Sequence, residues 1–306
     1  MDCSRGWIPT VSGPATYSAL AGDKHMNLTV AFIGLGSQGA PIAKHLAPAG
    51  FPTRVFDLVA ERMDEAVVSG ATAASSAAEA ADGADVIEIC VPEDDHVRAV
   101  VAEVLPTAKP GAVIAIHSTV LPDAVLEVAV AAAQRDIDVL DACVTGGPAR
   151  AVTKDIAFLV GGTEDVLERA RPVLAATSRQ IIHAGELGNG ARLKLCINLL
   201  TYIQWAAAYE SFQLARAVGL PVEIFEEAGT SNGQLTDLQQ QFLVMHKLPD
   251  ELRLSDEAQR NLRGFQAIAE KDLRWALRLA DQADLDLPVG ELVSRLMGRI
   301  YGVEEG

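Results

Sequence analysis

The sequence predicts an α/β protein: a doubly wound, mostly parallel sheet followed by an all-α C-terminal domain, the two joined by a long helix. From residue 28 to about residue 187, short β-branched runs alternate with alanine-rich stretches of helical periodicity, and only the helical periodicity continues beyond. The apolar runs are nearly continuous, as expected for parallel strands covered on both faces. The chain has 306 residues, 49% of them hydrophobic, enough for two domains with buried cores.

Five apolar runs are expected to form the parallel strands: Leu28–Ile33, Thr53–Phe56, Asp85–Val91, Ala112–Ile116 and Ile137–Leu140. The segments between them, such as Pro41–Ala49 and Ala124–Arg135, show helical apolar spacing. Parallel strands need such crossover connections. Ile156–Gly161 and Gln180–His183 are expected to add strands at the far edge of the sheet.

The long helix is expected over Ala191–Val218, ended by Gly219 and Pro221. Helical periodicity then predicts four further segments: Val222–Gly229, Gly233–Met245, Asp256–Ala280 and Val289–Tyr301. No strand pattern interrupts them, which is why the second domain is expected to be all-helical.

The composition excludes several classes of partner. The chain carries 25 Lys and Arg against 41 Asp and Glu, a net charge of −16, which argues against nucleic acid and anionic membranes. No run of about 20 apolar residues predicts a membrane span. The cysteines Cys3, Cys90, Cys143 and Cys196 stand far apart, which argues against a zinc finger or a disulfide framework. We therefore expect a cytoplasmic protein; an anionic small molecule stays possible, because it needs only one local site.

A glycine motif follows the first strand. In V-A-F-I-G-L-G-S-Q-G, the glycines Gly34, Gly36 and Gly39 stand in G-x-G-x-x-G register ahead of a helix. The first glycine permits a tight turn, the second lets a pyrophosphate approach, and the third allows the helix to pack on the strand. A helix N-terminus adds free N–H groups for the phosphates. The loop, with Leu35 and Gln38, thus predicts a Rossmann-type dinucleotide site; the alternative is an ordinary glycine turn.

The motif also divides the chain. We expect a dinucleotide-binding domain over residues 27–187 and a helical substrate and dimerisation domain over residues 188–306. Residues 1–26 are interrupted by Pro9, Gly13 and Pro14, lack the apolar run of a signal peptide, and are expected to be a disordered leader. Met26, just before the first strand pattern, would then be the true start.

An acidic residue ends the second strand. Asp57 follows Gly36 by 21 residues, where a carboxylate binds the ribose hydroxyls of NAD and repels the 2′-phosphate of NADP. The alternative role for Asp57 is an N-cap of the next helix. Arg54 and Arg62 lie close by in the sequence and keep NADP open. We expect NAD as the favoured cofactor.

Three further stretches follow strands or open the long helix: I-H-S-T-V-L-P at 116–122, D-A-C-V-T-G-G-P at 141–148 and G-N-G-A-R-L-K-L-C-I-N at 188–198. Loops at the carboxyl ends of parallel strands face a bound cofactor. By that argument Val91, Pro92 and Thr119 are expected on the cofactor side. A substrate carboxylate is expected to receive hydroxyl and N–H groups from Ser118, Thr119, Thr145, Gly146 and Gly147, although a Thr-Gly-Gly sequence also suits a plain turn.

Lys194 is the most specific single signal. Its helix is apolar almost all round, which predicts a buried lysine, and buried lysines need a partner. Asn198 lies one turn further on, and Thr201 extends a polar stripe. Burial lowers a lysine's pKa, which suits general acid–base work near neutral pH. The alternatives are a lysine that reaches solvent at the helix start, and His117 as the base instead.

Together these motifs resemble the β-hydroxyacid dehydrogenase family, which includes 3-hydroxyisobutyrate dehydrogenase, tartronate semialdehyde reductase and 6-phosphogluconate dehydrogenase. The resemblance extends over about residues 28–300. Its anchors are the glycine loop, the Ser-Thr pair at 118–119, D-A-C-V-T-G-G, G-x-G-x-x-x-K-x-x-x-N, and K-D-L at 271–273.

The resemblance implies roles for individual residues. Lys194 matches the catalytic lysine, which takes the hydroxyl proton as hydride leaves for the nicotinamide, and Asn198 matches the asparagine that helps to hold the substrate. Ser118 and the loop 145–147 match the groups that bind its carboxylate. Lys271 matches a lysine near the cofactor; the alternative is a solvated helix face. The family also implies homodimers or homotetramers formed through the helical domain.

Departures from the family pattern limit the substrate assignment. Gln38 replaces the usual methionine of the glycine loop, and Cys143 and Thr145 replace a proline and a serine. Thr201 stands where the 6-phosphogluconate enzyme has a catalytic glutamate, so we reject the decarboxylating reaction. We expect an NAD(P)-dependent oxidoreductase that interconverts a small β-hydroxy acid and its semialdehyde or keto acid. The alternatives are an imine reductase, which generally lacks the lysine, and a non-catalytic dinucleotide-binding scaffold.

Overall fold

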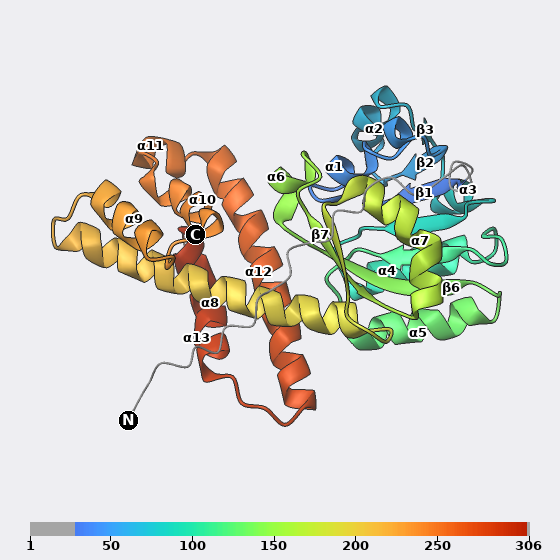
Figure 1. The fold of residues 1–306 in the computed structure, drawn as a ribbon. Coiled ribbons are helices and arrows are strands. Elements are labelled where there is room, and N and C mark those ends of the chain that lie inside the picture. Colours follow the sequence, from blue (N-terminus) through green and yellow to red (C-terminus); the bar gives the residue numbers. More distant parts are fainter. Residues whose placement is uncertain (1–27, 305–306) are drawn as a thin grey trace, which may run out of the picture.

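The computed structural model describes residues 28–304, so the expectations for residues 1–26 lie outside the described part of the chain. A sheet covered by helices forms one end of the molecule, and a helical region forms the other (Figure 1). The long helix α8 (Asn189–Ala217) starts against the sheet and continues into the helical region. The predicted order of a doubly wound sheet followed by helices is confirmed.

The sheet has eight strands: β1 (Val30–Ile33), β2 (Thr53–Phe56), β3 (Thr72–Ala73), β4 (Val86–Ile89), β5 (Val113–Ile116), β6 (Asp138–Thr145), β7 (Ala157–Gly161) and β8 (Gln180–His183). Their order is β3-β2-β1-β4-β5-β6-β7-β8. Neighbouring strands are parallel except β6 and β7. The order reverses between β1 and β4, and ligands of doubly wound sheets bind outside the carboxyl ends of the strands at such a point.

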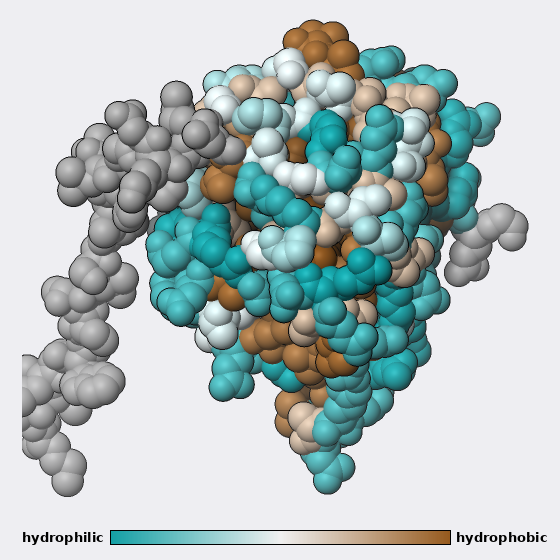
Figure 2. Space-filling model, turned by 90° about the vertical axis from the view of Figure 1, so that its right-hand side faces the viewer, coloured by the Kyte–Doolittle hydropathy of each residue, from teal (hydrophilic) through white to brown (hydrophobic). Residues whose placement is uncertain are grey.

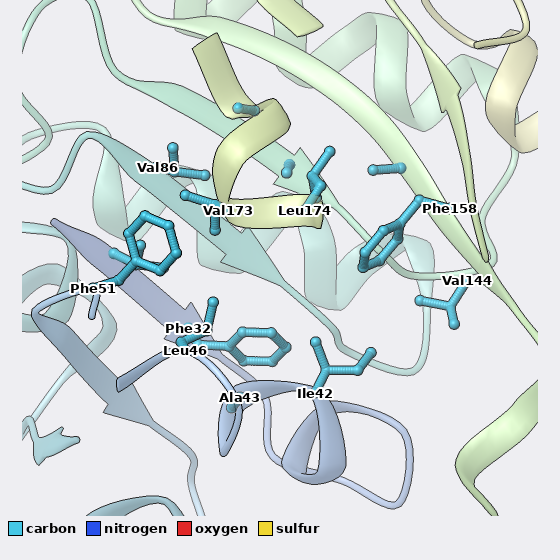
Figure 3. Close-up of a cluster of buried hydrophobic side chains, with 14 of the residues drawn as sticks. Phe32, Ile42, Ala43, Leu46, Phe51, Val86, Val144, Phe158, Val173 and Leu174 are labelled. Carbon is cyan, nitrogen blue, oxygen red and sulfur yellow. The ribbon is translucent and has the colours of Figure 1, made fainter. Parts of the chain in front are cut away.

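Helices cover both faces of the sheet. The helices of this region are α1 (Gly39–Ala43), α2 (Asp64–Val68), α3 (Ala77–Ala81), α4 (Asp94–Val104), α5 (Pro122–Ala133), α6 (Gly147–Ala151) and α7 (Glu164–Thr177). Val30 and Phe32 of β1 belong to the core under α1 and α7, whereas Ala31 and Ile33 belong to the core under α3, α4 and α5. In the first core, the side chains of Phe32, Ile42, Leu174 and Phe158 point toward one another (Figure 3). Burial on both faces explains the continuous apolar strands.

The helical region consists of most of α8 with α9 (Val222–Ser231), α10 (Asp237–Lys247), α11 (Asp250–Arg253), α12 (Asp256–Gln282) and α13 (Pro288–Tyr301). Its core is formed by Phe212, Phe242, Leu243, Leu273 and Met297 among others. Among residues 28–304, no helix combines the length and the apolar content needed to cross a membrane.

Three local expectations are corrected. The helix expected over Pro41–Ala49 is broken: α1 ends at Ala43, and a 3₁₀ turn over Ala47–Ala49 follows, because Pro48 has no N–H to continue the helical bonding. The short β3 was not expected. The strand expected over 137–140 extends to Thr145, because it pairs with β5 over its first half and with β7 over its second.

Candidate active site

The glycine loop lies between β1 and α1. A Cβ on Gly34, whose φ is +94°, would collide with the carbonyl oxygen of Cys90, and one on Gly39 would collide with the carbonyl oxygen of Gly34. A Cβ on Gly36 would meet nothing within 4 Å. The first and third glycines are thus required by the protein's own packing. The second leaves open space in front of the loop, as the approach of a pyrophosphate requires.

A second feature of this loop fits an anionic ligand. The side-chain Nε2 of Gln38 is buried and has no hydrogen-bond partner among the described residues. Gln38 is also the residue from which α1 begins. A buried amide donor without an acceptor is costly, so a phosphate oxygen placed here would satisfy it. The loop therefore fits the phosphates of a dinucleotide.

Asp57 lies just after β2 and is hydrogen-bonded to the backbone of the glycine loop. Its Oδ2 accepts a hydrogen bond from the backbone N–H of Leu35 at 2.7 Å, and its Oδ1 accepts one from Val59 at 2.8 Å. The guanidinium of Arg62 lies 3.3 Å from Oδ1. The helical turn that follows begins with Val59 as its N-cap, so the N-cap alternative for Asp57 is wrong. The structure brings together Asp57, Leu35 and Arg62.

Ser118 connects two strand-end loops. Its Oγ accepts a hydrogen bond from the N–H of Val91 at 2.9 Å, and its carbonyl oxygen accepts one from the thiol of Cys143 at 3.3 Å. The hydroxyl proton of Ser118 remains available to a ligand acceptor. The structure thus brings the loops after β4 and β5 and the strand β6 together at one edge of the sheet.

The Thr-Gly-Gly sequence continues this edge. Thr145 is the last residue of β6, and Gly146 and Gly147 have φ values of +121° and +78°, which side chains rarely adopt. The stretch 141–145 is therefore part of the strand, not a loop after it. The turn leaves Thr145, Gly146 and Gly147 only partly buried.

The start of α8 is fixed on the sheet by Asp141, a residue that the sequence reasoning missed. Its carboxylate accepts hydrogen bonds from the N–H of Gly188 at 2.8 Å and of Ala191 at 2.6 Å. A Cβ on Gly190 would collide with the carbonyl oxygen of Leu159. Burial raises the pKa of Asp141, against the effect of these two N–H groups. The only acid in D-A-C-V-T-G-G could have indicated this cap.

Lys194 lies one turn into α8. Burial lowers the pKa of its ammonium, the carboxylate of Asp272 raises it, and the charge of Lys271 lowers it. The side chain is only partly buried, not fully buried as expected, although Ala191 and Asn198 on the same side of α8 are buried. A lysine in this position has access to a substrate.

Asp272 is the centre of a buried polar cluster. Its Oδ2 accepts hydrogen bonds from the amide Nδ2 of Asn198 at 2.6 Å and from the hydroxyl of Tyr202 at 3.0 Å. The ammonium of Lys271 lies 3.2 Å from its Oδ1. Only 3% of Asp272 is exposed. The sequence reasoning missed Asp272 and Tyr202; the acid in the K-D-L motif was the available signal.

Lys271 joins the helical region to the cofactor side of the sheet. Its Nζ donates hydrogen bonds to the carbonyl oxygens of Pro92 at 3.1 Å and Thr119 at 2.8 Å. The structure thus brings together three residues that were predicted near the cofactor. The alternative of a solvated helix face is wrong, because only 8% of Lys271 is exposed.

His117 is not placed to act as the base. Its Nδ1 is 2.8 Å from the carbonyl oxygen of Ala142, and its Nε2 is 3.2 Å from Oε1 of Glu88. Its ring is stacked between Phe32 and Phe158 inside the core. Both ring nitrogens are therefore engaged within the sheet.

Comparison with known proteins identifies the family. Residues 29–185 match the family described as the NAD binding domain of 6-phosphogluconate dehydrogenase. The NAD-dependent L-serine dehydrogenase of Pseudomonas aeruginosa is 35% identical over 272 residues, which cover 87% of this chain and 90% of that protein. This chain belongs to the β-hydroxyacid dehydrogenase family. A β-hydroxyacid dehydrogenase fold is also seen in the solved Mycobacterium tuberculosis 3-hydroxyisobutyrate dehydrogenase with L-serine, with TM-score 0.76, 30% identity, and coverage of 90% of this chain and 94% of that one.

Membership of the β-hydroxyacid dehydrogenase family makes this chain an oxidoreductase that uses a nicotinamide dinucleotide and acts on a small hydroxy acid. The imine reductase of Streptomyces aurantiacus shares only 17% identity with a TM-score of 0.63, so that likeness extends to the fold alone.

Proposed function

We propose that this β-hydroxyacid dehydrogenase oxidises the hydroxyl group of a small β-hydroxy acid, and catalyses the reverse reduction, with Lys194 as the general acid and base. The observation that carries the proposal is the position of Lys194, partly buried at the start of a helix that Asp141 fixes beside the strand-end loops. Burial lowers its pKa, which favours the neutral amine that can accept a proton.

The surrounding residues have separate roles. The hydroxyl of Ser118 and the N–H groups around Gly146 and Gly147 would bind the substrate carboxylate, in charge-assisted hydrogen bonds. Lys194 takes the hydroxyl proton during oxidation and returns it during reduction. A bound nicotinamide dinucleotide supplies the hydride acceptor for this chemistry.

The names of three relatives suggest the substrate class. They are the L-serine dehydrogenase, the 3-hydroxyisobutyrate dehydrogenase of Pseudomonas aeruginosa, 34% identical, and the 2-(hydroxymethyl)glutarate dehydrogenase of Eubacterium barkeri, 30% identical. All three named acids share the unit HOCH₂–CH(R)–COO⁻ and differ only in the substituent R on carbon 2. We propose that the substrate of this chain has the same unit and gives a semialdehyde.

We propose NAD rather than NADP as the cofactor. The carboxylate of Asp57 is hydrogen-bonded to the glycine loop, where it would attract ribose hydroxyls and repel a 2′-phosphate. Among the three relatives above, the L-serine dehydrogenase is named as NAD-dependent. Arg62, beside Asp57, is the group that would favour NADP.

We also propose that the protein works as a homodimer or homotetramer in the cytoplasm. Large apolar side chains of the helical region are about half exposed: Leu200, Leu214, Phe265, Ile268 and Leu292. By contrast, hydrophilic residues predominate on the face at the sheet end of the molecule, with hydrophobic areas at its upper and lower ends (Figure 2). Self-association through the helical region would cover the apolar residues. Cys90, Cys143 and Cys196 are free thiols, as a reducing compartment would keep them.

Substitution of Lys194 tests the proposed chemistry. A positioned general base contributes about 10²- to 10⁴-fold, so Lys194→Ala should lower turnover of a hydroxy acid at least about a hundredfold. Binding of NAD, measured by calorimetry, should persist, because the glycine loop is untouched. Lys194→Arg should not restore turnover, since a guanidinium keeps its proton. Near wild-type turnover by Lys194→Ala would overturn the assignment.

A further inference from the structure

A buried polar pair lies in the middle of the sheet. Nε2 of His117, the residue after β5, is 3.2 Å from Oε1 of Glu88 on β4, and neither side chain is exposed. The His117 ring is stacked between Phe32 and Phe158, two rings of the core that Figure 3 shows. The second carboxyl oxygen of Glu88 is buried and has no hydrogen-bond partner among residues 28–304. Well-packed apolar residues often stabilise a fold as much as a buried pair of this kind, or more, so stability does not account for it.

His117 and a nearby cysteine connect β5 to β6 beyond the end of their backbone pairing, which ends one residue before His117. Nδ1 of His117 donates a hydrogen bond to the carbonyl oxygen of Ala142 at 2.8 Å, since a carbonyl only accepts. In return, the thiol of Cys143 donates one to the carbonyl oxygen of Ser118 at 3.3 Å. In the described part of the chain, no backbone hydrogen bond joins residues 117–119 to β6. These two side chains therefore hold the strand ends together.

Glu88 determines which way the His117 ring faces. Turned over about its bond to Cβ, the ring would place carbon atoms opposite both the carbonyl of Ala142 and the carboxyl of Glu88. The carboxyl at Nε2 therefore keeps Nδ1 on Ala142. Just after β4, the strand of Glu88, the N–H of Val91 donates to Oγ of Ser118 at 2.9 Å. The strands β4, β5 and β6 thus act together on the position of Ser118.

This connection joins the two halves of the proposed carboxylate site. Ser118 follows His117 directly, and the loop 145–147 begins two residues after Cys143. In the proposed function, on which this step rests, one substrate carboxylate is bound by both. Donors on separate chain segments can bind one carboxylate together only if their spacing is held, and a misplacement of about 1 Å can cost about a hundredfold in rate.

We propose that His117 and Glu88 are positioning residues for substrate binding: with Cys143 they hold Ser118 at a fixed distance from the loop 145–147, so that one carboxylate contacts both. Cys143 stands where the family pattern has a proline, which offers no side-chain donor, so the bond to Ser118 is a feature of this chain. Loss of the pair should weaken the binding of the substrate more than it weakens the fold.

Replacing both members of the pair by apolar residues separates the two effects. In His117→Met combined with Glu88→Leu, KM for the acid should rise at least about tenfold, while kcat, which depends on Lys194, should change less. The urea midpoint of unfolding should fall little, because removal of the buried pair offsets the donor that Ala142 loses. A wild-type KM in this double variant would overturn the proposal.

Two comparisons distinguish positioning from general support. Glu88→Gln keeps a group that can donate to Nε2 of a neutral ring, so KM should stay within about twofold of the wild-type value. In a Ser118→Ala background, the double replacement should raise KM by about twofold or less, because the residue that the pair positions is already lost. A tenfold rise in both backgrounds would show that the pair does not act through Ser118.

The probes are L-serine and 3-hydroxyisobutyrate, the acids named for two relatives, and calorimetry gives the Kd of each for the NAD-bound protein beside KM. If the wild type binds but oxidises neither acid, the proposed function fails, and the Kd values of the variants decide this inference. An unchanged KM and Kd in Ser118→Ala would remove Ser118 from the carboxylate site and this inference with it. Absence of binding to the wild type would contradict both.

Cys143 supplies the test if the double variant does not fold. Cys143→Ala removes only the second bond to Ser118, so KM and Kd should rise at least about threefold. Cys143→Ser keeps a donor and should restore both values. Wild-type values in Cys143→Ala would then refute the positioning of Ser118 by this connection.

Discussion

Opposing influences act on the amine of Lys194. Burial and the charge of Lys271 lower its pKa, whereas the carboxylate of Asp272 raises it, and the net shift is downward. Oxidation requires the neutral amine, so its rate should rise with pH through this lowered pKa. Reduction requires the ammonium and should fall over the same range.

Replacing Asp272 by Asn should shift the dependence of the oxidation rate on pH. Loss of the carboxylate removes the influence that raises the pKa of Lys194, so the ascending limb for oxidation should shift to lower pH. The measurement is kcat/KM for oxidation against pH for both proteins. Tyr202→Phe is the matched control, because it keeps the charge and should leave the midpoint in place. An unchanged midpoint in Asp272→Asn would show that another group titrates.

The cofactor prediction concerns Asp57. NAD should bind at least tenfold tighter than NADP, about 1.4 kcal/mol. Asp57→Ala should narrow that ratio, and it should weaken both cofactors, because the N–H of Leu35 loses its acceptor. Arg62→Ala should weaken only the remaining NADP binding. Fluorescence titration with NADH and NADPH measures the affinities of all three proteins, and equal affinities of the wild type for the two cofactors would contradict the assignment.

Residues that belong to sequence motifs could be predicted, whereas their partners could not. Lys194, Ser118 and the glycines carry local patterns that indicate chemistry. Asp272 lies 74 positions from Asn198, and Asp141 lies 50 positions from Ala191, so no local pattern joins them. Their roles depend on which elements the fold brings together.

Helices and strands could be predicted where a single local pattern of apolar residues determines their type and their ends. The buried parallel strands and α8 fall within a few residues of their expected ranges, because continuous apolar runs and the following Gly219 and Pro221 mark them. The length of β6 could not be predicted, because its second half depends on antiparallel pairing with β7. A local pattern does not show which strand supplies that pairing.

The first turn of α8 depends on Asp141. Asp141→Ala removes a buried carboxylate that accepts two backbone N–H groups of α8, so the free energy of unfolding should fall by about 2–4 kcal/mol. Turnover should fall as well, because Lys194 is carried by the first turns of this helix. Denaturant unfolding and steady-state kinetics measure the two effects.

Asp138→Ala is the matched control on the same strand. Asp138 is exposed and pairs with Arg169 at the surface, so its loss should cost about 1 kcal/mol or less and leave turnover intact. Equal losses of stability and of turnover in the two variants would show that Asp141 has no special role in fixing the start of α8.

At the scale of the whole molecule, the order of the sheet and the helical region followed from the sequence, but the way they meet did not. The helix α8 provides the covalent connection (Figure 1). The side chain of Lys271 adds hydrogen bonds from α12 to two loops of the sheet. This second connection needs a tertiary arrangement in which residues 92, 119 and 271 meet. The K-D-L motif alone indicated only that Lys271 lies near the cofactor.

Lys271→Met tests whether this connection supports cofactor binding. Methionine keeps much of the length of the side chain but removes the donor to Pro92 and Thr119, so these loops should be held less firmly. Loss of hydrogen bonds from a charged donor should lower the free energy of unfolding by about 1.5–3 kcal/mol. The Kd for NAD should rise at least about tenfold, which equals about 1.4 kcal/mol. Lys247→Met, which removes a lysine of the helical region paired with Glu226, is the control and should change both quantities little. A Lys271→Met protein that loses stability but binds NAD with wild-type affinity would restrict Lys271 to a structural role, and the cofactor side of the site would then depend on the sheet alone.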